Sequence, residues 1–358
     1  MKPTERLRDL GQSLWLDNIT RQLLDSGTLQ RYIDTLSVTG LTSNPTIFDH
    51  AIKGSADYDA DIRARAGMDA EALFFELAIA DIRRAADLFL PVHERSHGTD
   101  GFVSLEVSPL LAYDTQTSLA QARDLHARAA RRNLFIKIPG TREGLPAIEE
   151  AIFAGVPVNV TLLFSAAHYR AAAEAWLRGI ERRIAAGLAP NVASVASIFI
   201  SRWDVAVAGK LGSELHMKLG VAVGRQAIKA YGDWLASPRV RRAMNFGALP
   251  QRLLLASTGT KDKQASDTLY VEALAAPLTV DTIPEATLLA LADHGGMAQA
   301  APADGGDCEA VLAAHRAAGI DLDALAAKLQ ADGAASFVAS WNELMAAIAA
   351  KRAALAAA

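Results

Sequence analysis

The chain has 358 residues, 51% of them hydrophobic, which is enough apolar sequence to bury a large core. Its 36 basic and 40 acidic residues are interleaved and give a formal net charge of −4, which argues against a nucleic-acid or membrane surface. The single cysteine, Cys308, excludes an internal disulfide framework and a cysteine-based metal cluster, and we interpret it as an idle thiol.

The chain begins with a charged segment that lacks the apolar core of a signal peptide, and no apolar stretch is long enough to span a bilayer. We therefore expect a soluble, cytoplasmic protein. Short apolar runs then alternate with segments in which apolar residues recur at helical spacing. The predicted strands are 14–19, 40–45, 102–108, 134–138, 156–163, 192–200, 252–257 and 278–283. The predicted helices are 4–13, 20–36, two long helices within 56–90, 115–131, 142–153, 166–187, 203–236 and 264–274.

This alternation predicts the fold class. Strands separated by helices form parallel sheets, and eight strands is the number that closes a barrel. We expect an α/β protein, a (β/α)8 TIM barrel with additional helices, in which residues 1–358 form a single domain. The tail, 297–358, departs from the alternation, since 297–307 is small and polar while 318–329 and the alanine-rich 335–357 are predicted helices. We expect it to be a helical extension of the same domain, with its long helix packed across the barrel.

A lysine interrupts the fourth predicted strand. Lys137 lies among four large apolar residues of 134–138, where burial disfavours the charged ammonium form. A neutral buried amine is what attack on a carbonyl requires, so Lys137 is a candidate Schiff-base nucleophile. Taken alone, the strand also allows a surface lysine or a buried ion pair.

Other strands place polar residues on the face that Lys137 shares. Because side chains alternate in direction along a strand, Asp17, Glu106, Asn159 and Thr161 fall on the side of small or aromatic neighbours, away from the aliphatic face. Any one of them could be structural, but burying several without purpose has an additive cost. The polar residues within or at the ends of the predicted strands are Asp17, Asn44, Ser104, Glu106, Lys137, Asn159, Thr161, Ser194, Ser197 and Ser257.

The chemistry that suits this set is imine-based cleavage of a carbon–carbon bond. The lysine amine attacks the C2 carbonyl of a ketose, and the iminium accepts the electron pair left when the C3–C4 bond breaks. One carboxylate must take the proton of the C4 hydroxyl, and a second acid or base must manage the loss of water during imine formation. Asp17 and Glu106 are the two carboxylates available.

Five segments resemble motifs of the transaldolase family, in the same order. They are WLDNI (15–19), GLTSNPTIF (40–48), VSLEVSP (103–109), LFIKIPGT (134–141) and VNVTLLFS (158–165). The resemblance runs from about residue 12 to the end of the eighth strand and fits the longer bacterial type. It implies transfer of a dihydroxyacetone unit in the non-oxidative pentose phosphate pathway, without metal or organic cofactor. The implied donors are sedoheptulose 7-phosphate or fructose 6-phosphate, and the acceptors glyceraldehyde 3-phosphate or erythrose 4-phosphate.

The resemblance also implies roles for single residues. Lys137 matches the Schiff-base lysine and Asp17 the acid/base for the C4 hydroxyl. Glu106 and Thr161 match the pair that holds the catalytic water. The residues that match contacts to the hydroxyls of dihydroxyacetone are Asn44 and Asn159.

The phosphate end matches less completely. Ser197 and Arg202 have the spacing by which the family grips the substrate phosphate, and a guanidinium fork suits phosphate geometry. Where many transaldolases have a further arginine after the seventh strand, this chain has the loop from Ser257 to Lys261. Its backbone N–H groups, its hydroxyls and Lys261 are candidates to bind phosphate. The alternative for Lys261 is a solvated lysine, which is our interpretation of Lys263.

Two alternatives to a transaldolase remain. An aldolase-type lyase would use the same lysine but release free dihydroxyacetone, unless the long C-terminal helix covers the barrel mouth and keeps water from the enamine. A non-catalytic sugar-phosphate-binding barrel would have no reason to bury an amine between two carboxylates.

The histidines show no ligand-like pairing, so we expect no metal. The expected partners are sugar phosphates, without nucleic acid or membrane, and both a monomer and a homodimer fit the sequence.

Overall fold

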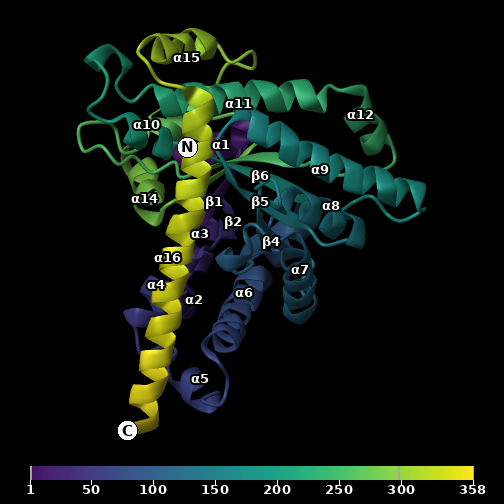
Figure 1. The fold of residues 1–358 in the computed structure, drawn as a ribbon, viewed down its shortest axis with the longest axis vertical. Coiled ribbons are helices and arrows are strands. Elements are labelled where there is room, and N and C mark those ends of the chain that lie inside the picture. Colours follow the sequence, from purple (N-terminus) through teal and green to yellow (C-terminus); the bar gives the residue numbers. More distant parts are fainter. Residues whose placement is uncertain (1, 297–298, 358) are drawn as a thin grey trace.

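The computed structural model describes residues 2–296 and 299–357, and eight parallel strands form a closed barrel at its centre (Figure 1). Each strand pairs with the next along the chain, and β8 pairs with β1. The predicted (β/α)8 barrel is therefore confirmed, and each strand agrees with its prediction to within a few residues. The strands are β1 (Ser13–Asp17), β2 (Val38–Thr42), β3 (Val103–Glu106), β4 (Leu134–Pro139), β5 (Val158–Leu163), β6 (Ser194–Phe199), β7 (Arg252–Ala256) and β8 (Val280–Ile283).

Helices surround the barrel and extend beyond it. Most of them connect one strand to the next, as a parallel barrel requires. The helices are α1 (Pro3–Leu10), α2 (Arg21–Asp25), α3 (Thr28–Thr35), α4 (Pro45–Lys53), α5 (Asp59–Ala64), α6 (Ala70–Arg95), α7 (Thr115–Ala129), α8 (Gly144–Ala154), α9 (Ala166–Ala185), α10 (Ser201–Val207), α11 (Leu219–Leu235), α12 (Pro238–Asn245), α13 (Leu269–Ala273), α14 (Glu285–His294), α15 (Cys308–Ala317) and α16 (Leu322–Ala357).

Several helices differ from the sequence prediction. The two long helices expected within 56–90 are a short α5 and a 26-residue α6. Residues 44–45, predicted to end the second strand, instead begin α4: the Asn44 side chain accepts a hydrogen bond from the Ile47 backbone N–H, and Pro45 occupies the first turn. The expected helix 203–236 is divided into α10 and α11, with Gly209 between them in the left-handed region at φ 71°.

The tail also differs from its prediction. Helices α14 and α15 were not expected, and a single 36-residue helix, α16, replaces the predicted pair 318–329 and 335–357. Gly333 lies inside this helix, and a Cβ there would be only 3.0 Å from Leu162 Cδ2. The glycine therefore permits a close approach to β5 and does not end the helix. Of the predicted polar segment 297–307, residues 297–298 lie outside the described residues.

The alternation of side chains along the strands is as predicted. On β4, Phe135 points into the barrel while Leu134 and Ile136 join the large cluster between the sheet and the helices. Trp15, Phe102 and Phe135 form an aromatic plug inside the barrel, with ring centroids 4.1 Å apart for Phe102–Phe135 and 6.0 Å for Trp15–Phe135. A Cβ on Gly40 would lie 2.5 Å from Trp15 Nε1, so only glycine leaves room for this plug.

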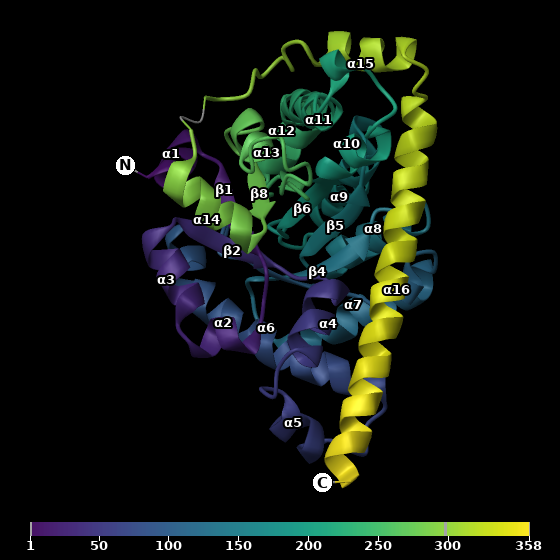
Figure 2. The ribbon, with the colours of Figure 1, turned by 90° about the vertical axis from the view of Figure 1, so that its left-hand side faces the viewer.

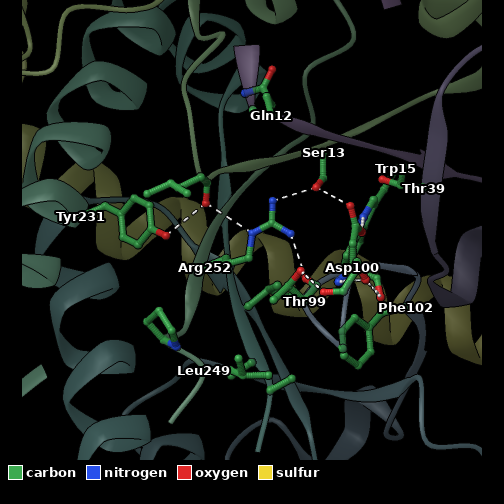
Figure 3. Close-up of a pocket in the computed structure, with 18 of the residues that line it drawn as sticks. Gln12, Ser13, Trp15, Thr39, Thr99, Asp100, Phe102, Tyr231, Leu249 and Arg252 are labelled. Carbon is green, nitrogen blue, oxygen red and sulfur yellow. Dashed lines mark hydrogen bonds between the residues drawn. The ribbon is translucent and has the colours of Figure 1, made fainter. Parts of the chain in front are cut away.

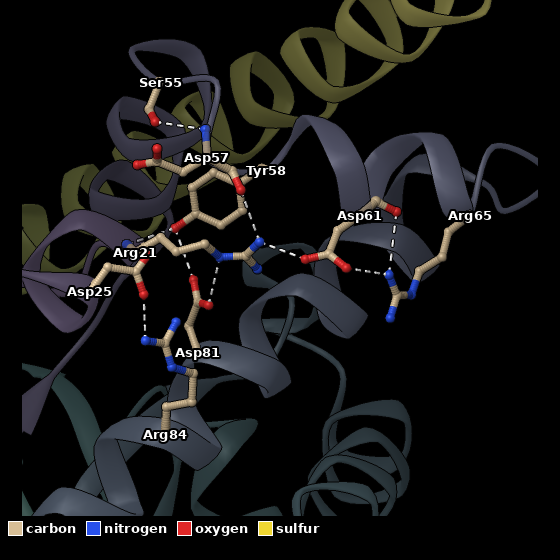
Figure 4. Close-up of polar contacts among 9 residues, drawn as sticks. All are labelled: Arg21, Asp25, Ser55, Asp57, Tyr58, Asp61, Arg65, Asp81 and Arg84. Atoms are coloured by element: carbon tan, nitrogen blue, oxygen red, sulfur yellow. Dashed lines mark hydrogen bonds and ion pairs between the residues drawn. The ribbon is translucent and has the colours of Figure 1, made fainter.

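A buried polar network fixes the helices that follow β1 and β2 (Figure 4). Arg21 donates to Asp81 Oδ1 at 3.0 Å and to Asp61 Oδ2 at 2.5 Å, and its guanidinium lies 4.2 Å from the centroid of the Tyr58 ring. The Tyr58 hydroxyl donates to the second Asp81 oxygen at 2.8 Å. Asp81 is 1% exposed, so its charge depends on these donors. The network joins α2, α5 and α6 just behind the strand that carries Asp17.

Helix α16 runs the length of the molecule, from the neighbourhood of α15 to α5 (Figure 2). It contacts α4, α5, α6 and β5. Gln330 donates to the carbonyls of Gly140 and Leu162, which lie after β4 and in β5, at 3.1 and 2.9 Å. The helix therefore crosses the carboxyl-end side of the barrel. That residues 1–358 form one domain, with 297–358 as its extension, stays a prediction. No helix in the described part of the chain is long and apolar enough to cross a bilayer.

Candidate active site

A cavity of about 240 Å³ opens at the carboxyl ends of the strands. Nine of the ten predicted site residues line it, and the tenth, Glu106, lies directly behind Lys137. The nine lining residues lie on six of the eight strands or in the segments that follow them. The closed sheet therefore brings together residues that are far apart in the sequence. The predicted residues that line the cavity are Asp17, Asn44, Lys137, Asn159, Thr161, Ser197, Arg202, Ser257 and Lys261.

Lys137 is the most enclosed cation of the site. It is 5% exposed, because β4 points it inward two residues beyond Phe135. Its Nζ donates to the carbonyl oxygen of Ser43 at 2.9 Å and lies 3.1 Å from Glu106 Oε2. The surface-lysine alternative is therefore wrong. The buried ion pair is present, and it places the amine at the wall of the cavity.

Glu106 faces the amine from the neighbouring strand, since Glu106 and Lys137 are partners in the β3–β4 register. Burial raises the pKa of the Glu106 carboxyl, and the nearby Lys137 charge only partly opposes this shift. Neither Glu106 oxygen accepts a well-directed hydrogen bond from a described residue, and the same holds for the buried Thr161 hydroxyl. These atoms keep hydrogen-bonding capacity beside the amine.

Asp17 is the second carboxylate of the site, at the end of β1. The Thr42 hydroxyl donates to Asp17 Oδ1 at 2.7 Å and also pairs with the Thr282 hydroxyl at 2.6 Å. Burial raises the pKa of Asp17, against the opposing effects of the Lys137 charge and the Thr42 hydrogen bond. Two carboxyls with raised pKa values therefore lie near one lysine, which suits groups that must both take up and release a proton.

Two amides lie on the cavity wall. Asn159 donates to Ser104 Oγ at 3.2 Å and accepts from the Ser197 hydroxyl at 2.7 Å. These bonds fix which way the amide points. Asn44 uses its side-chain carbonyl oxygen to cap α4, which fixes the amide, and the residue lines the cavity. Ser197 is thus part of the inner hydrogen-bond chain as well as of the lining.

The outer part of the cavity is cationic. Arg202 and Lys261 are both exposed, line the cavity and form no ion pair with any residue that the structure describes. Ser257 begins the loop that carries Lys261, and its φ of 56° places it in the left-handed region. Its hydroxyl pairs with that of Ser201 at 2.8 Å, which ties this loop to the start of α10.

Comparison with known proteins identifies the family. The family model for transaldolase/fructose-6-phosphate aldolase matches residues 14–348. The chain belongs to this family. It is 45% identical to a transaldolase of Saccharopolyspora erythraea over 95% of each chain, and 43% identical to one of Parafrankia over 96% of each. A transaldolase of Thiobacillus denitrificans is 43% identical over 97% of this chain and all of the relative. The expectation of a transaldolase-family enzyme is therefore confirmed.

The sequence reasoning missed three parts of this transaldolase-family site. Thr42, which orients Asp17, lies two residues after Gly40 on the inner face of β2, so the alternation could have identified it. The Ser43 carbonyl that accepts from Lys137 carries no sequence signal, because every residue has one. Phe337 reaches the cavity from α16, two hundred residues after Lys137 in the chain. Its place there depends on how α16 packs.

Metal-binding clusters and the single cysteine were also considered in the sequence. Within 2–296 and 299–357, no three His, Cys, Asp or Glu residues are placed to hold a metal ion. Cys308 is buried in the first turn of α15.

Proposed function

We propose that this protein is a transaldolase that transfers a dihydroxyacetone unit between sugar phosphates through a Schiff base on Lys137. The observation that carries this proposal is the buried Lys137 amine, which lines the cavity with Asp17 and lies 3.1 Å from Glu106. The transaldolases that the chain resembles over nearly its whole length support the same activity. The donor is sedoheptulose 7-phosphate or fructose 6-phosphate, and the acceptor is glyceraldehyde 3-phosphate or erythrose 4-phosphate.

The reaction begins at the donor carbonyl. Lys137 passes its proton to Glu106, 3.1 Å away, and the neutral amine adds to C2. The carbinolamine then takes up a proton and loses water to give an iminium ion. Asp17 then takes the proton of the C4 hydroxyl while the C3–C4 bond breaks, and the electron pair moves into the iminium to form an enamine. The aldose phosphate leaves. The enamine attacks the carbonyl of the acceptor aldose, Asp17 returns its proton to the new hydroxyl, and water releases the product ketose from Lys137.

Glu106 and Thr161 handle the water that leaves and returns during imine formation and hydrolysis. Their support is geometric: both have buried polar atoms without a hydrogen bond from a described residue, and Glu106 lies beside the amine. The raised pKa of Glu106 suits a group that both gives and takes a proton.

The remaining residues hold the substrate. Asn44 and Asn159 present amide groups to the hydroxyls of the dihydroxyacetone unit. Arg202 and Lys261 supply two unpaired cations for the phosphate, with the Ser197 and Ser257 hydroxyls near them on the wall. This assignment places the ketone deep in the barrel and the phosphate at its mouth.

Transfer requires that the enamine meets an aldehyde before it is protonated and released by water. Phe337 of α16 lines the cavity and is 9% exposed, so an aromatic ring covers part of the mouth. This cover favours transfer over the lyase reaction, in which free dihydroxyacetone would be released.

Borohydride trapping with fructose 6-phosphate tests the proposal. Reduction should attach the three-carbon unit to Lys137 and to no other lysine, as mass spectrometry of the peptides would show. No label on Lys137 would end the Schiff-base assignment. Adding erythrose 4-phosphate should then give sedoheptulose 7-phosphate; release of dihydroxyacetone alone would indicate the lyase instead. Binding of fructose 6-phosphate without label or turnover would indicate a non-catalytic barrel.

We further infer that the enzyme works in the cytoplasm and that its partners are sugar phosphates, without nucleic acid or membrane. The interleaved charge of −4 supports the part of this inference that concerns nucleic acid and membrane.

A further inference from the structure

A second cavity, of about 660 Å³, lies at the opposite end of the barrel from the catalytic one (Figure 3). Its wall is built from residues at or just before the first residue of several strands, including Ser13, Ser194, Arg252 and Leu278. Its volume falls within the range of small-molecule sites in proteins. None of the residues assigned above to catalysis or substrate binding lines it.

The aromatic plug forms the floor of this cavity. Trp15, Phe102 and Phe135 all line it, and Phe102 and Phe135 are stacked. The flat faces and edges of these rings, together with side chains such as Val195 and Leu249, make the inner wall apolar. An apolar cavity of this size gains free energy when it takes up an apolar body, since burial removes that body from water.

The polar part of the wall has an excess of positive charge. Arg8, Arg241 and Arg252 line the cavity, and Asp100 is its one acidic residue within the described chain. Arg8 is paired with Asp9 at 2.8 Å, so the excess comes from Arg241 and Arg252. The oxygens of Asp100 already accept hydrogen bonds from the Ser13 hydroxyl, at 2.5 Å, and from Trp15 Nε1, at 2.8 Å. In a chain of net charge −4, this cavity therefore attracts anions.

Arg252 and Arg241 provide this charge in different ways. Arg252 is half-buried and held in place, because it donates to the Ser13 hydroxyl at 2.7 Å and to the carbonyls of Thr99, Thr279 and Leu278 at 3.1, 2.7 and 3.3 Å. No carboxylate of the described residues lies within ion-pair distance of it. Arg241, on α12, is exposed, and its side chain makes neither a hydrogen bond nor an ion pair with any described residue. One fixed and one free guanidinium thus face an apolar chamber.

We propose that this cavity is a binding site for a small organic anion with a flat apolar body and a single carboxylate, sulfonate or phosphate group. The body lies against the aromatic plug, and the anionic group meets Arg241 and Arg252 at the wall. The free Arg241 guanidinium has paired N–H donors for such an oxyanion, whereas Arg252, with four of its five N–H groups already donated, contributes its charge and the remaining N–H. Guanidinium ions are weakly hydrated, which suits a partly buried contact.

The plug connects this site to the catalytic residues. Trp15 precedes Asp17 by two positions on β1, and Phe135 precedes Lys137 by two on β4. A ligand that presses on these rings acts on the two strands that carry the acid/base and the amine, so occupancy alters turnover without competing with the ketose. This coupling rests on the proposed function, whereas the binding site does not.

Fluorescence titration with 8-anilino-1-naphthalenesulfonate, an aromatic sulfonate, tests the binding on the whole chain. We expect one saturable site per chain that fructose 6-phosphate and inorganic phosphate do not displace. Filling the cavity by Ala193→Trp or, independently, Leu249→Trp should abolish the signal while the circular dichroism spectrum of the folded protein is retained. Arg241→Gln should weaken binding roughly threefold, as expected for a partly exposed charge, and the matched change Arg242→Gln on the same helix should not.

Three results would overturn the site: no saturable binding, displacement by fructose 6-phosphate, or binding that survives both tryptophan variants. A dimer in sedimentation velocity that loses the probe on association would also overturn it, because a second copy would then cover the mouth of the cavity.

The coupling between this site and catalysis is measured as kcat at a saturating concentration of the probe. We expect the probe to change kcat while KM for fructose 6-phosphate stays constant. In both tryptophan variants, the probe should no longer change kcat. An unchanged kcat with the probe bound refutes the coupling alone, and a chain that binds the probe but lacks activity refutes the proposed function alone.

Discussion

The Thr258 hydroxyl donates a 2.7 Å hydrogen bond to Asp281 Oδ1, and this contact joins the loop after β7 to β8. Asp281 is fully buried, and its second oxygen accepts no hydrogen bond from a described residue. Thr258 directly follows Ser257, whose left-handed φ of 56° is costly for a residue with a side chain. The carboxyl thus helps to hold the strained residue that begins the proposed phosphate-binding loop.

Asp281 should make stability depend on pH. Burial raises its pKa from 3.8 to about 7. Because the folded state binds the proton more tightly than the unfolded state does, the stabilisation is complete below about pH 4 and is lost as pH rises through about 7. Asp281→Asn keeps an acceptor for Thr258 and has no proton to lose. Relative to this variant, the wild type should lose on the order of a few kcal/mol of unfolding free energy between pH 4 and 8. Urea denaturation at both pH values measures it, and a constant difference would contradict the assignment.

Lys137→Ala should abolish turnover and leave the fold intact. Removal of a nucleophile costs roughly 10⁴-fold or more in kcat. The protein should tolerate the loss of the charge because Glu106, whose pKa is already raised by burial, can take up a proton. A coupled assay and far-UV circular dichroism measure the two parts. Activity retained in a folded Lys137→Ala variant would refute the mechanism.

Asp17 should set the acidic limb of the pH–rate profile. It must be ionised to take the proton of the C4 hydroxyl, and burial raises its pKa. In the wild type, kcat/KM should therefore fall as pH falls through a value above the ordinary carboxyl pKa. Asp17→Asn should lower kcat by about 10²- to 10⁴-fold. Glu106→Gln, which changes the other carboxyl of the site, is the matched comparison. The role of Asp17 would be contradicted if the acidic limb of the wild-type kcat/KM profile had its midpoint at the ordinary carboxyl pKa.

Arg202 and Lys261 should act on the phosphate and not on the chemistry. Arg202→Met or Lys261→Met removes one charge-assisted contact and should raise KM for fructose 6-phosphate by roughly tenfold or more. The slow reaction of unphosphorylated fructose should be unaffected. Lys263→Met is the control, since Lys263 does not line the cavity. An equal effect on both sugars would place these cations elsewhere in the mechanism.

Phe337→Ala should change the fate of the enamine. The smaller side chain opens the mouth, so water reaches the intermediate more readily and a larger share of donor turnover should end as free dihydroxyacetone. Product analysis with and without erythrose 4-phosphate gives this share. An unchanged share would show that α16 does not exclude water.

The barrel and its inner residues could be predicted because they follow from the two-residue period of a strand. The alternation along β4 separates Lys137 from the aliphatic residues beside it, and the same rule places Asp17 and Asn159. Features that depend on packing could not be predicted in this way. Helix α16 continues through Gly333 because the glycine lies against Leu162, a contact that the sequence does not show.

The second cavity, at the amino ends of the strands, could not be predicted for the same reason. Its wall combines short pieces of many elements, and neither Arg241 nor Arg252 belongs to a recognisable motif. Lys261 was predicted from its loop, but only the structure shows that it is exposed beside Arg202 in the same cavity.

The aromatic plug has a consequence for the order of events in catalysis. Because stacked rings fill the barrel below Lys137, the cavity formed by the described residues opens at the carboxyl ends of the strands and not through the barrel. The aldose phosphate made in the first half-reaction must leave through this opening, and the incoming aldose must use it next and dock on the same cations. Under the proposed mechanism we therefore expect that the two half-reactions do not overlap and that the enzyme follows a double-displacement cycle, in which Lys137 gains and loses the three-carbon unit in turn.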